Sequence, residues 1–176
     1  MQSVKIFLVG YMGSGKSTLG KQLANRLQFK FVDLDKTIEE KEGHELFDIF
    51  NKQGEAYFRG LEKKYLHETT ALLEDAVIAV GGGTPCFYDN MSFMNKEGVT
   101  VYLKMDASSL AYRIFNGKGK RPLVDGKSEA DLKVFVKDHL AEREDMYNDA
   151  SIIVEALGFD AKKLDELASR LRAYSK

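Results

Sequence analysis

Short apolar runs alternate along this chain with longer segments in which apolar residues recur every three or four positions. The runs predict buried strands at Lys5–Val9, Lys30–Leu34, Ala76–Val80, Thr100–Leu103 and Ser151–Val154. The longer segments predict helices at Ser17–Gln28, Lys36–Phe50, Glu55–Glu74, Tyr88–Glu97, Ala107–Phe115, Ser128–Met146 and Asp160–Ala173. This alternation is typical of a three-layer α/β/α fold with a five-stranded parallel sheet, and 176 residues fit one domain.

A glycine-rich turn joins the first predicted strand to the first predicted helix. Residues 10–18, Gly-Tyr-Met-Gly-Ser-Gly-Lys-Ser-Thr, fit the pattern G-x-x-x-x-G-K-[ST] of a phosphate-binding loop. The glycines let backbone N–H groups close around phosphate oxygens, and the helix adds the positive end of its dipole. Lys16 is expected to reach the β- and γ-phosphates, and the Ser17 hydroxyl to bind Mg²⁺. The sequence therefore predicts a P-loop fold that binds a nucleotide through Gly13, Ser14, Gly15, Lys16, Ser17 and Thr18.

Composition and charge narrow the functional classes. The chain has 26 Lys and Arg against 27 Asp and Glu, a net charge of −1, which argues against a nucleic-acid partner. Cys86 is the only cysteine, so neither an intramolecular disulfide nor a cysteine-based zinc site is expected. The sequence shows no run of membrane-spanning length and no signal-peptide layout, so we expect a cytoplasmic protein without a membrane partner. A monomer is the default expectation.

Two carboxylates close the second predicted strand, in Asp33-Leu34-Asp35. Alternate residues of a strand share a face, so both carboxylates are expected to point toward the same crevice. One could hold Mg²⁺ through water, and the other could accept a proton from a substrate hydroxyl. The residues alone do not decide which does which, and a simple helix cap is the alternative.

Several other motifs have both a functional and a purely structural interpretation. Arg59 and Glu62 lie three apart on a predicted helix, so they form either a solvated ion pair or a clamp in which Arg59 grips a carboxylate. Arg143 falls late in a predicted helix with Tyr147 four residues on, and the residues alone favour an ordinary solvated position for it. The run Gly81-Gly82-Gly83 after the third strand indicates either a simple turn or the close approach of a ligand to the backbone.

Apolar residues and a basic loop complete the set of candidates. Leu46 and Phe50, with Phe58 nearby, have the spacing of core residues, or of the apolar wall of a small-molecule pocket. Residues 116–126 contain three glycines, a proline and three cations, a composition typical of a mobile flap. Arg121 in this loop could neutralise charge on a transferring phosphoryl group, or belong to a solvated basic loop.

Taken together and in order, these motifs resemble the shikimate kinase family. The resemblance covers nearly the whole chain and rests on the phosphate loop, Asp33-x-Asp35, Phe58-Arg59-x-x-Glu62, Gly81-Gly82-Gly83, Arg121-Pro122-Leu123, and Arg143 with Tyr147. It implies a single-domain kinase of the nucleoside-monophosphate-kinase type, with a substrate-binding helical region at 36–61 and a lid at 116–126. The implied reaction transfers the γ-phosphate of ATP to the 3-hydroxyl of shikimate, with Mg²⁺ as cofactor.

The resemblance also implies a role for each residue. Asp35 binds the shikimate hydroxyls, Asp33 orients the Mg²⁺ shell, and Arg121 folds over the phosphates. The implied contacts to shikimate come from Asp35, Arg59, Gly81, Gly82, Gly83, Arg143, Leu46, Phe50 and Phe58, with Glu62 steering Arg59. Many family members carry an arginine near the adenine, soon after the last strand. Residues 155–159 here contain no cation, so Arg113 is expected to do more of that work.

Rival functions remain less well matched. A gluconate or small-polyol kinase would share the phosphate loop, but Phe-Arg-x-x-Glu and the triple glycine favour a cyclic acid as substrate. A GTP-dependent switch would need an Asn-Lys-x-Asp motif, and Asn51-Lys52-Gln53-Gly54 lacks the aspartate. A catalytically inactive binding module is the third alternative.

Overall fold

The structure is a computed structural model that describes residues 3–117 and 123–175. Within them, five strands form one parallel sheet in the order β2-β3-β1-β4-β5. The strands are β1 Lys5–Val9, β2 Lys30–Asp33, β3 Ala76–Ala79, β4 Val99–Lys104 and β5 Ile152–Glu155. The predicted α/β fold with a five-stranded parallel sheet is confirmed, and each predicted strand overlaps an observed one.

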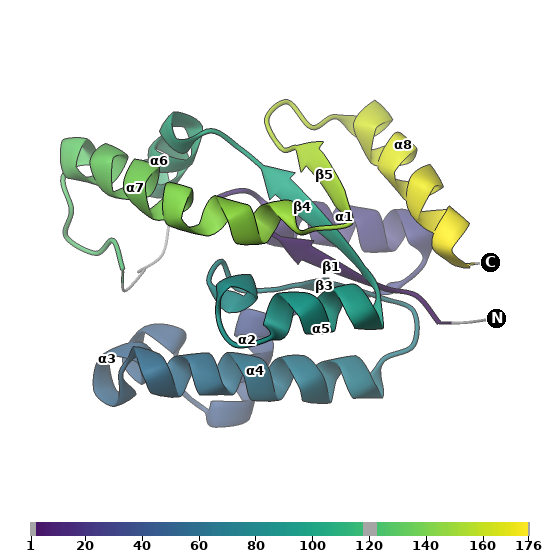
Figure 1. The fold of residues 1–176 in the computed structure, drawn as a ribbon, viewed down its shortest axis with the longest axis horizontal. Helices are drawn as coiled ribbons and strands as arrows, with labels where there is room; N and C mark the ends of the chain where they lie inside the picture. Colours follow the sequence, from purple (N-terminus) through teal and green to yellow (C-terminus); the bar gives the residue numbers. More distant parts are fainter. Residues whose placement is uncertain (1–2, 118–122, 176) are drawn as a thin grey trace.

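Helices fill the connections between the strands. They are α1 Lys16–Leu27, α2 Leu34–Glu42, α3 Leu46–Gln53, α4 Glu55–Leu72, α5 Asn90–Glu97, α6 Ala107–Asn116, α7 Glu129–Asn148 and α8 Ala161–Arg172. Two short 3₁₀ turns, Thr84–Cys86 and Ala173–Ser175, accompany them. Figure 1 shows α1 behind the sheet and α5 and α7 in front of it, so helices cover both faces, and α8 packs against α1. In the described residues, no helix is both long and apolar enough to cross a membrane.

The centre of the sheet explains where a ligand can bind. β1 lies between β3 and β4, with Phe7 paired to Ile78 on one side and to Thr100 on the other. Because helices cover both faces, β1 is apolar and buried almost throughout, as the sequence predicted. The chain leaves β1 toward β2 and β3 on one side and later returns to β4 and β5 on the other. Ligands bind at the carboxyl ends of strands at such a switch point, which here is Gly10.

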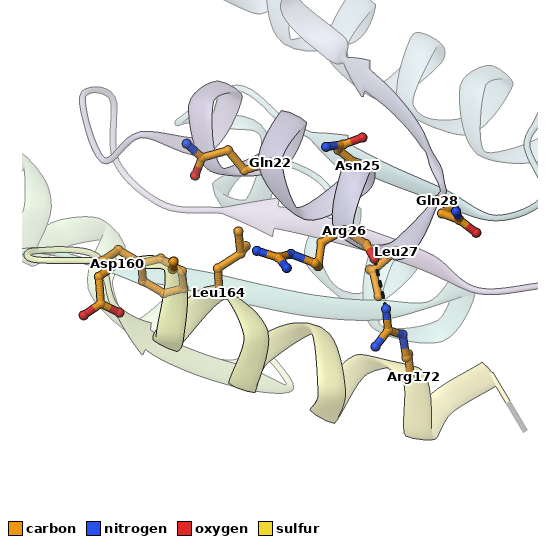
Figure 2. Close-up of a pocket in the computed structure, with 10 residues that line it drawn as sticks. Gln22, Asn25, Arg26, Leu27, Gln28, Asp160, Leu164 and Arg172 are labelled. Carbon is orange, nitrogen blue, oxygen red and sulfur yellow. Dashed lines mark hydrogen bonds between the residues drawn. The ribbon is translucent and has the colours of Figure 1, made fainter.

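Helices α1 and α8 pack against each other through apolar side chains. α1 buries Leu19, Leu23, Ala24 and Leu27, and α8 buries Leu164, Leu167, Ala168 and Leu171. Arg26 forms an ion pair with Asp165 at 3.1 Å, and Arg172 donates to the Arg26 carbonyl at 3.0 Å. A hollow of about 820 Å³ lies beside this contact, and it is lined by polar and apolar residues of α1, of residues 159–161 and of both ends of α8 (Figure 2). None of the predicted site residues lines this hollow.

The predicted single helix Lys36–Phe50 is wrong, because the chain forms two helices there. α2 ends at Gly43, whose φ of 69° is left-handed, and the Gly43 N–H donates to the Glu39 carbonyl at 2.9 Å. Glycine adopts this conformation without a steric penalty and commonly ends a helix in this way. Residues 39–45 contain no apolar residue, so periodicity does not mark the break, and Gly43 itself was the only local signal of a helix end.

The predicted extension of the second strand to Leu34 is also wrong. The strand ends at Asp33, and the fully buried Leu34 is the first residue of α2. Asp35 therefore lies in the first turn of a helix, not on the strand face that carries Asp33. Both side chains still line the same cleft, because α2 begins at the carboxyl edge of the sheet.

Two glycine substitutions should change the free energy of unfolding in opposite directions. A Cβ on Gly98 would collide with the backbone carbonyl of Lys5, so Gly98→Ala should lower the free energy of unfolding by roughly 1–3 kcal/mol. Gly60 lies on the exposed side of α4 with nothing within 4 Å of such a Cβ. Gly60→Ala should therefore raise the stability by about 0.5–1 kcal/mol. Urea unfolding of both variants checks this, and equal effects would contradict the close approach of Gly98 to the Lys5 backbone.

Candidate active site

A cleft of about 980 Å³ opens at the carboxyl ends of the strands. The predicted site residues that line it are Gly13, Gly15, Lys16, Ser17, Thr18, Asp33, Asp35, Leu46, Phe50, Phe58, Arg59, Glu62, Gly81, Gly82, Gly83, Arg113 and Arg143. Ser14 of the phosphate loop is buried, and its hydroxyl has no hydrogen-bond partner among the described residues. Arg121 lies outside the described residues. Motifs from distant parts of the chain thus come together in one place.

The phosphate loop ends in a helix N-terminus that no side chain caps. Gly15 is the N-cap of α1, with a left-handed φ of 97° and no side-chain hydrogen bond to the helix. In contrast, Ser128 and Asp160 cap α7 and α8 with their side chains. The first N–H groups of a helix need acceptors, and a helix N-terminus carries partial positive charge. Helices α2, α3, α4 and α5 also lack a side-chain cap, so it is the glycine-rich motif that marks the start of α1 as an anion-binding site.

Polar side chains of the loop form hydrogen bonds within the loop and to the end of β2. Lys16 Nζ donates to the carbonyls of Gly10 at 2.7 Å and Tyr11 at 3.0 Å. The Ser17 hydroxyl donates to Asp33 Oδ2 at 2.6 Å. Although Asp33 is the N-cap of α2, it makes no side-chain cap to that helix. Its carboxylate points instead toward the phosphate loop.

Ser17 and Asp33 supply oxygen atoms of the kind that Mg²⁺ prefers. Mg²⁺ typically uses one or two carboxylates together with substrate phosphates and waters, rather than a cage made of protein alone. Among the described residues, no cluster of three or more His, Cys, Asp or Glu is placed to hold a metal ion. The hydroxyl and carboxylate at this edge of the cleft fit a metal that is shared with a nucleotide.

Asp35 is an acid in an unusual environment. Its Oδ1 is buried and has no hydrogen-bond partner among the described residues. Burial raises the pKa of Asp35 to about 7, and the negative charges of Glu62 and Asp33 add to this effect. A carboxylate with a pKa near neutrality can accept a proton from a hydroxyl and release it again.

Arg59 and Glu62 form a buried ion pair on the inner face of α4. Arg59 Nη1 lies 2.6 Å from Glu62 Oε2, and the two side chains are 5% and 1% exposed. The Thr84 hydroxyl donates to the other carboxylate oxygen, Glu62 Oε1, at 2.6 Å. Burial raises the pKa of Glu62, while Arg59 and Thr84 counteract that shift. The pair is therefore not the solvated one that the spacing alone favoured.

The triple glycine makes room for this pair. A Cβ on Gly83 would lie 2.5 Å from Arg59 Nη1, and a Cβ on Gly81 would lie 2.5 Å from Glu62 Oε1. Both distances are far shorter than van der Waals contact. Side chains are excluded at these positions because the charged groups of α4 pack directly against the backbone.

Arg143 and Tyr147 approach the same backbone from α7. Both are buried, and the Tyr147 hydroxyl donates to the Gly82 carbonyl at 2.5 Å. Burial raises the pKa of the nearby Cys86 thiol, while Arg143 and then Arg59 lower it, so both cations lie close to one point. Within the described residues, no carboxylate lies within ion-pair distance of Arg143. A buried cation of this kind favours an anionic ligand.

An apolar wall faces the two arginines. Leu46, Phe47 and Phe50 of α3 line the cleft together with Phe58 of α4. The rings of Phe50 and Phe58 meet edge to face, with centroids 5.7 Å apart. Apolar walls around a few fixed polar groups are typical of small-molecule sites.

Arg113 reaches the phosphate loop from α6. Its Nη1 lies 3.7 Å from the position that a Cβ on Gly15 would occupy. The side chain therefore stands over the loop at the start of α1, where it can meet phosphate as well as a base.

Sequence reasoning missed some residues of the site. Thr84 supports Glu62 without any recognisable motif, and His139 shares a hydrogen bond of 2.8 Å with the hydroxyl of Tyr11 in the phosphate loop. Glu55 also contacts Arg59, and its spacing of four residues on one helix was a visible signal.

Known proteins match both this sequence and this geometry. A protein-family model described as shikimate kinase matches residues 12–172. The chain belongs to the shikimate kinase family. The resemblance expected from the motifs is thereby confirmed.

Individual shikimate kinases agree over nearly the whole chain. That of Azobacteroides pseudotrichonymphae is 48% identical over 149 residues, which span 85% of this chain and 88% of the relative. The crystal structure of the enzyme from Bacteroides thetaiotaomicron superposes with a TM-score of 0.87 at 42% identity and 97% coverage of both chains. The shikimate kinase of Acinetobacter baumannii, solved in complex with shikimate, gives a TM-score of 0.83 at 32% identity, covering 97% of this chain and 91% of that one.

In this member of the shikimate kinase family, His139 should make stability depend on pH. Burial, and then the charge of Arg143, lower the pKa of His139 below its ordinary value. The unfolded chain therefore binds a proton at a higher pH than the folded one does. Stability is complete above the ordinary histidine pKa of about 6.5 and falls as the pH drops below it.

The change in the free energy of unfolding should stay below roughly 1.4 kcal/mol per pH unit, which is the most that one titrating proton can cause. Urea unfolding at several pH values between 5 and 8 measures it, with His139→Gln as the comparison. The difference between the two proteins should shrink as the pH falls. A difference that is constant with pH would contradict the shifted pKa.

Proposed function

We propose that this chain transfers the γ-phosphate of ATP to the 3-hydroxyl of shikimate, giving shikimate 3-phosphate and ADP. The observation that carries the proposal is that one cleft joins an uncapped phosphate loop to two buried arginines. The first feature suits a nucleotide, and the second suits a small carboxylic acid. Membership of the shikimate kinase family names the acid.

On the nucleotide side, the backbone N–H groups of Gly13 to Thr18 hold the phosphates. Lys16, which now donates to loop carbonyls, turns to the β- and γ-phosphates. Arg113 adds a second cation over the start of α1. The Ser17 hydroxyl and the Asp33 carboxylate would hold the Mg²⁺ that accompanies ATP, and this ion would supply neutralising charge to the phosphates.

On the acceptor side, Arg59 and Arg143 hold the carboxylate of shikimate. Glu62 keeps Arg59 in place, and the backbone of residues 81–83 faces the ring hydroxyls. Leu46, Phe50 and Phe58 pack against the apolar part of the ring. These contacts fix the orientation in which a single hydroxyl faces the γ-phosphate.

Asp35 is then the base. The 3-hydroxyl oxygen forms a bond to the γ-phosphorus, the bond from that phosphorus to the β–γ bridging oxygen breaks, and the hydroxyl proton passes to Asp35. A pKa of about 7 before substrates bind suits a group that accepts and returns one proton per cycle. Phosphoryl transfer requires mainly positioning and charge neutralisation, which the cations of this cleft provide.

The proposal also includes a closing lid, a monomeric state and a cytoplasmic location. Arg121 and the lid at 116–126 close over the phosphates and exclude water, which would limit the hydrolysis of ATP. The chain acts as one domain and as a monomer. Its substrates are small molecules, and a cytoplasmic location fits their use.

The first test compares acceptors. Release of ADP is measured with Mg²⁺ and ATP in the presence of shikimate, gluconate or no acceptor. Turnover that depends on shikimate, with little release of ADP in its absence, is expected because only shikimate fits both arginines and the apolar wall. Turnover with gluconate alone would assign the two arginines to an open-chain acid and overturn the proposal.

Three substitutions should separate the roles of the residues. Asp35→Asn should lower kcat about 10²–10⁴-fold through loss of the base. Arg59→Ala should raise the KM for shikimate by one to two orders of magnitude, since a charged hydrogen bond contributes about 1.5–3 kcal/mol. Lys16→Ala should lose activity because the β- and γ-phosphates of ATP lose their lysine contact. Activity like that of the wild type in Arg59→Ala would remove the carboxylate clamp from the mechanism.

A further inference from the structure

Arg59 contacts a second carboxylate besides Glu62. Glu55, the first residue of α4, accepts from Arg59 Nε at 3.2 Å and from Arg59 Nη2 at 3.0 Å with the same oxygen, Oε1. Glu62 accepts from Nη1 at 2.6 Å on the next turn. The helix thus supplies both acidic partners of its own arginine, one on each side along the axis.

The guanidinium of Arg59 has N–H donors that neither glutamate engages. Arginine has five N–H donors in a rigid plane. Glu55 engages Nε and one N–H of Nη2, and Glu62 engages one N–H of Nη1. One N–H on each terminal nitrogen remains, and no acceptor for either is found in residues 3–117 and 123–175. Two donors at adjacent nitrogens suit a carboxylate.

The position of Glu55 decides which edge of Arg59 is left for a ligand. Arg59 and Glu62 line the cleft, whereas Glu55 is absent from the described residues that line it. Glu55 is 44% exposed, while the Arg59 side chain is 5% exposed. Glu55 therefore engages the Nε–Nη2 edge from outside the cleft. The ring of Phe87, 4.3 Å from the guanidinium carbon, covers the planar group.

We propose that Glu55 is a positioning residue for the acceptor's carboxylate. By occupying the Nε–Nη2 edge, it prevents rotation of the guanidinium and keeps the terminal N–H donors directed into the cleft. This inference rests on the proposed function, in which Arg59 binds that carboxylate. Because Glu55 is partly exposed, water screens its charge, so its geometric effect on Arg59 outweighs its repulsion of the ligand.

An ordinary surface ion pair is the competing explanation. Pairs spaced four residues apart on an exposed helix contribute only about 0.3–0.5 kcal/mol to stability. Glu129 offers a matched control, because it is also the first residue of its helix and pairs with Lys133 four residues on, at 2.8 Å. Glu129→Ala removes the same helix-start charge without touching the cleft.

The kinetic test compares Glu55→Ala, Glu55→Gln and Glu129→Ala. Glu55→Ala should raise the KM for shikimate about tenfold, with kcat within about twofold and the KM for ATP unchanged. Glu55→Gln should restore most of the loss, since its amide oxygen can accept from the same two N–H groups. With the methyl ester of shikimate as acceptor, the effect of Glu55→Ala should largely disappear. An equal effect on both acceptors, or an equal effect of Glu129→Ala, would overturn the inference.

A second measurement needs no substrate, so it separates this inference from the proposed function. In the wild-type protein, the Arg59 Nε–H should give an NMR signal that exchanges slowly with water. Glu55→Ala should make that exchange at least tenfold faster, and Glu129→Ala should not change it. Fast exchange in the wild type would overturn the positioning role, whatever the acceptor assays show. Slow exchange without turnover of shikimate would overturn the proposed function and leave Arg59 held by Glu55.

Discussion

The buried ion pair between Arg59 and Glu62 is the interaction on which the rest of the cleft depends. Two charges withdrawn from water cost more free energy than they return, unless their remaining donors and acceptors are satisfied. Here Thr84 engages the second oxygen of Glu62, and the absence of side chains at Gly81 and Gly83 lets the backbone pack against both groups. The ion pair therefore serves to position the guanidinium of Arg59, rather than to stabilise the fold.

The cation so placed is one of several that the fold gathers at the carboxyl edge of the sheet. Lys16 and Arg113 stand at the phosphate loop, and Arg143 approaches from α7. Lys16 follows β1, Arg59 lies between β2 and β3, and Arg113 and Arg143 both lie between β4 and β5. A parallel sheet thus brings together cations that are far apart in the sequence. With a net charge of only −1, the protein does not owe this gathering of charge to its overall composition.

The sequence predicted the sheet and the phosphate loop well, because both depend on local patterns. Buried parallel strands leave continuous apolar runs, and the phosphate loop has a motif of its own. The break at Gly43 was missed because residues 39–45 contain no apolar residue, so the periodicity gives no information there. The burial of Arg59 could not be predicted from spacing, since the same i, i+3 pair is usually solvated. Burial of that pair follows from tertiary contacts with residues 81–84, which only the folded chain brings near.

The buried side chain of Tyr11 couples the phosphate loop to the protein core. Tyr11 is 1% exposed and bonds to His139 on α7, while its carbonyl receives Lys16. Binding loops commonly open locally, at a free-energy cost well below that of global unfolding. This loop cannot open in that way without withdrawing an aromatic ring from the core. Nucleotide affinity and conformational stability are therefore thermodynamically linked. A substitution that destabilises the core should lower the affinity for the nucleotide, and a bound nucleotide should raise the melting temperature of the protein.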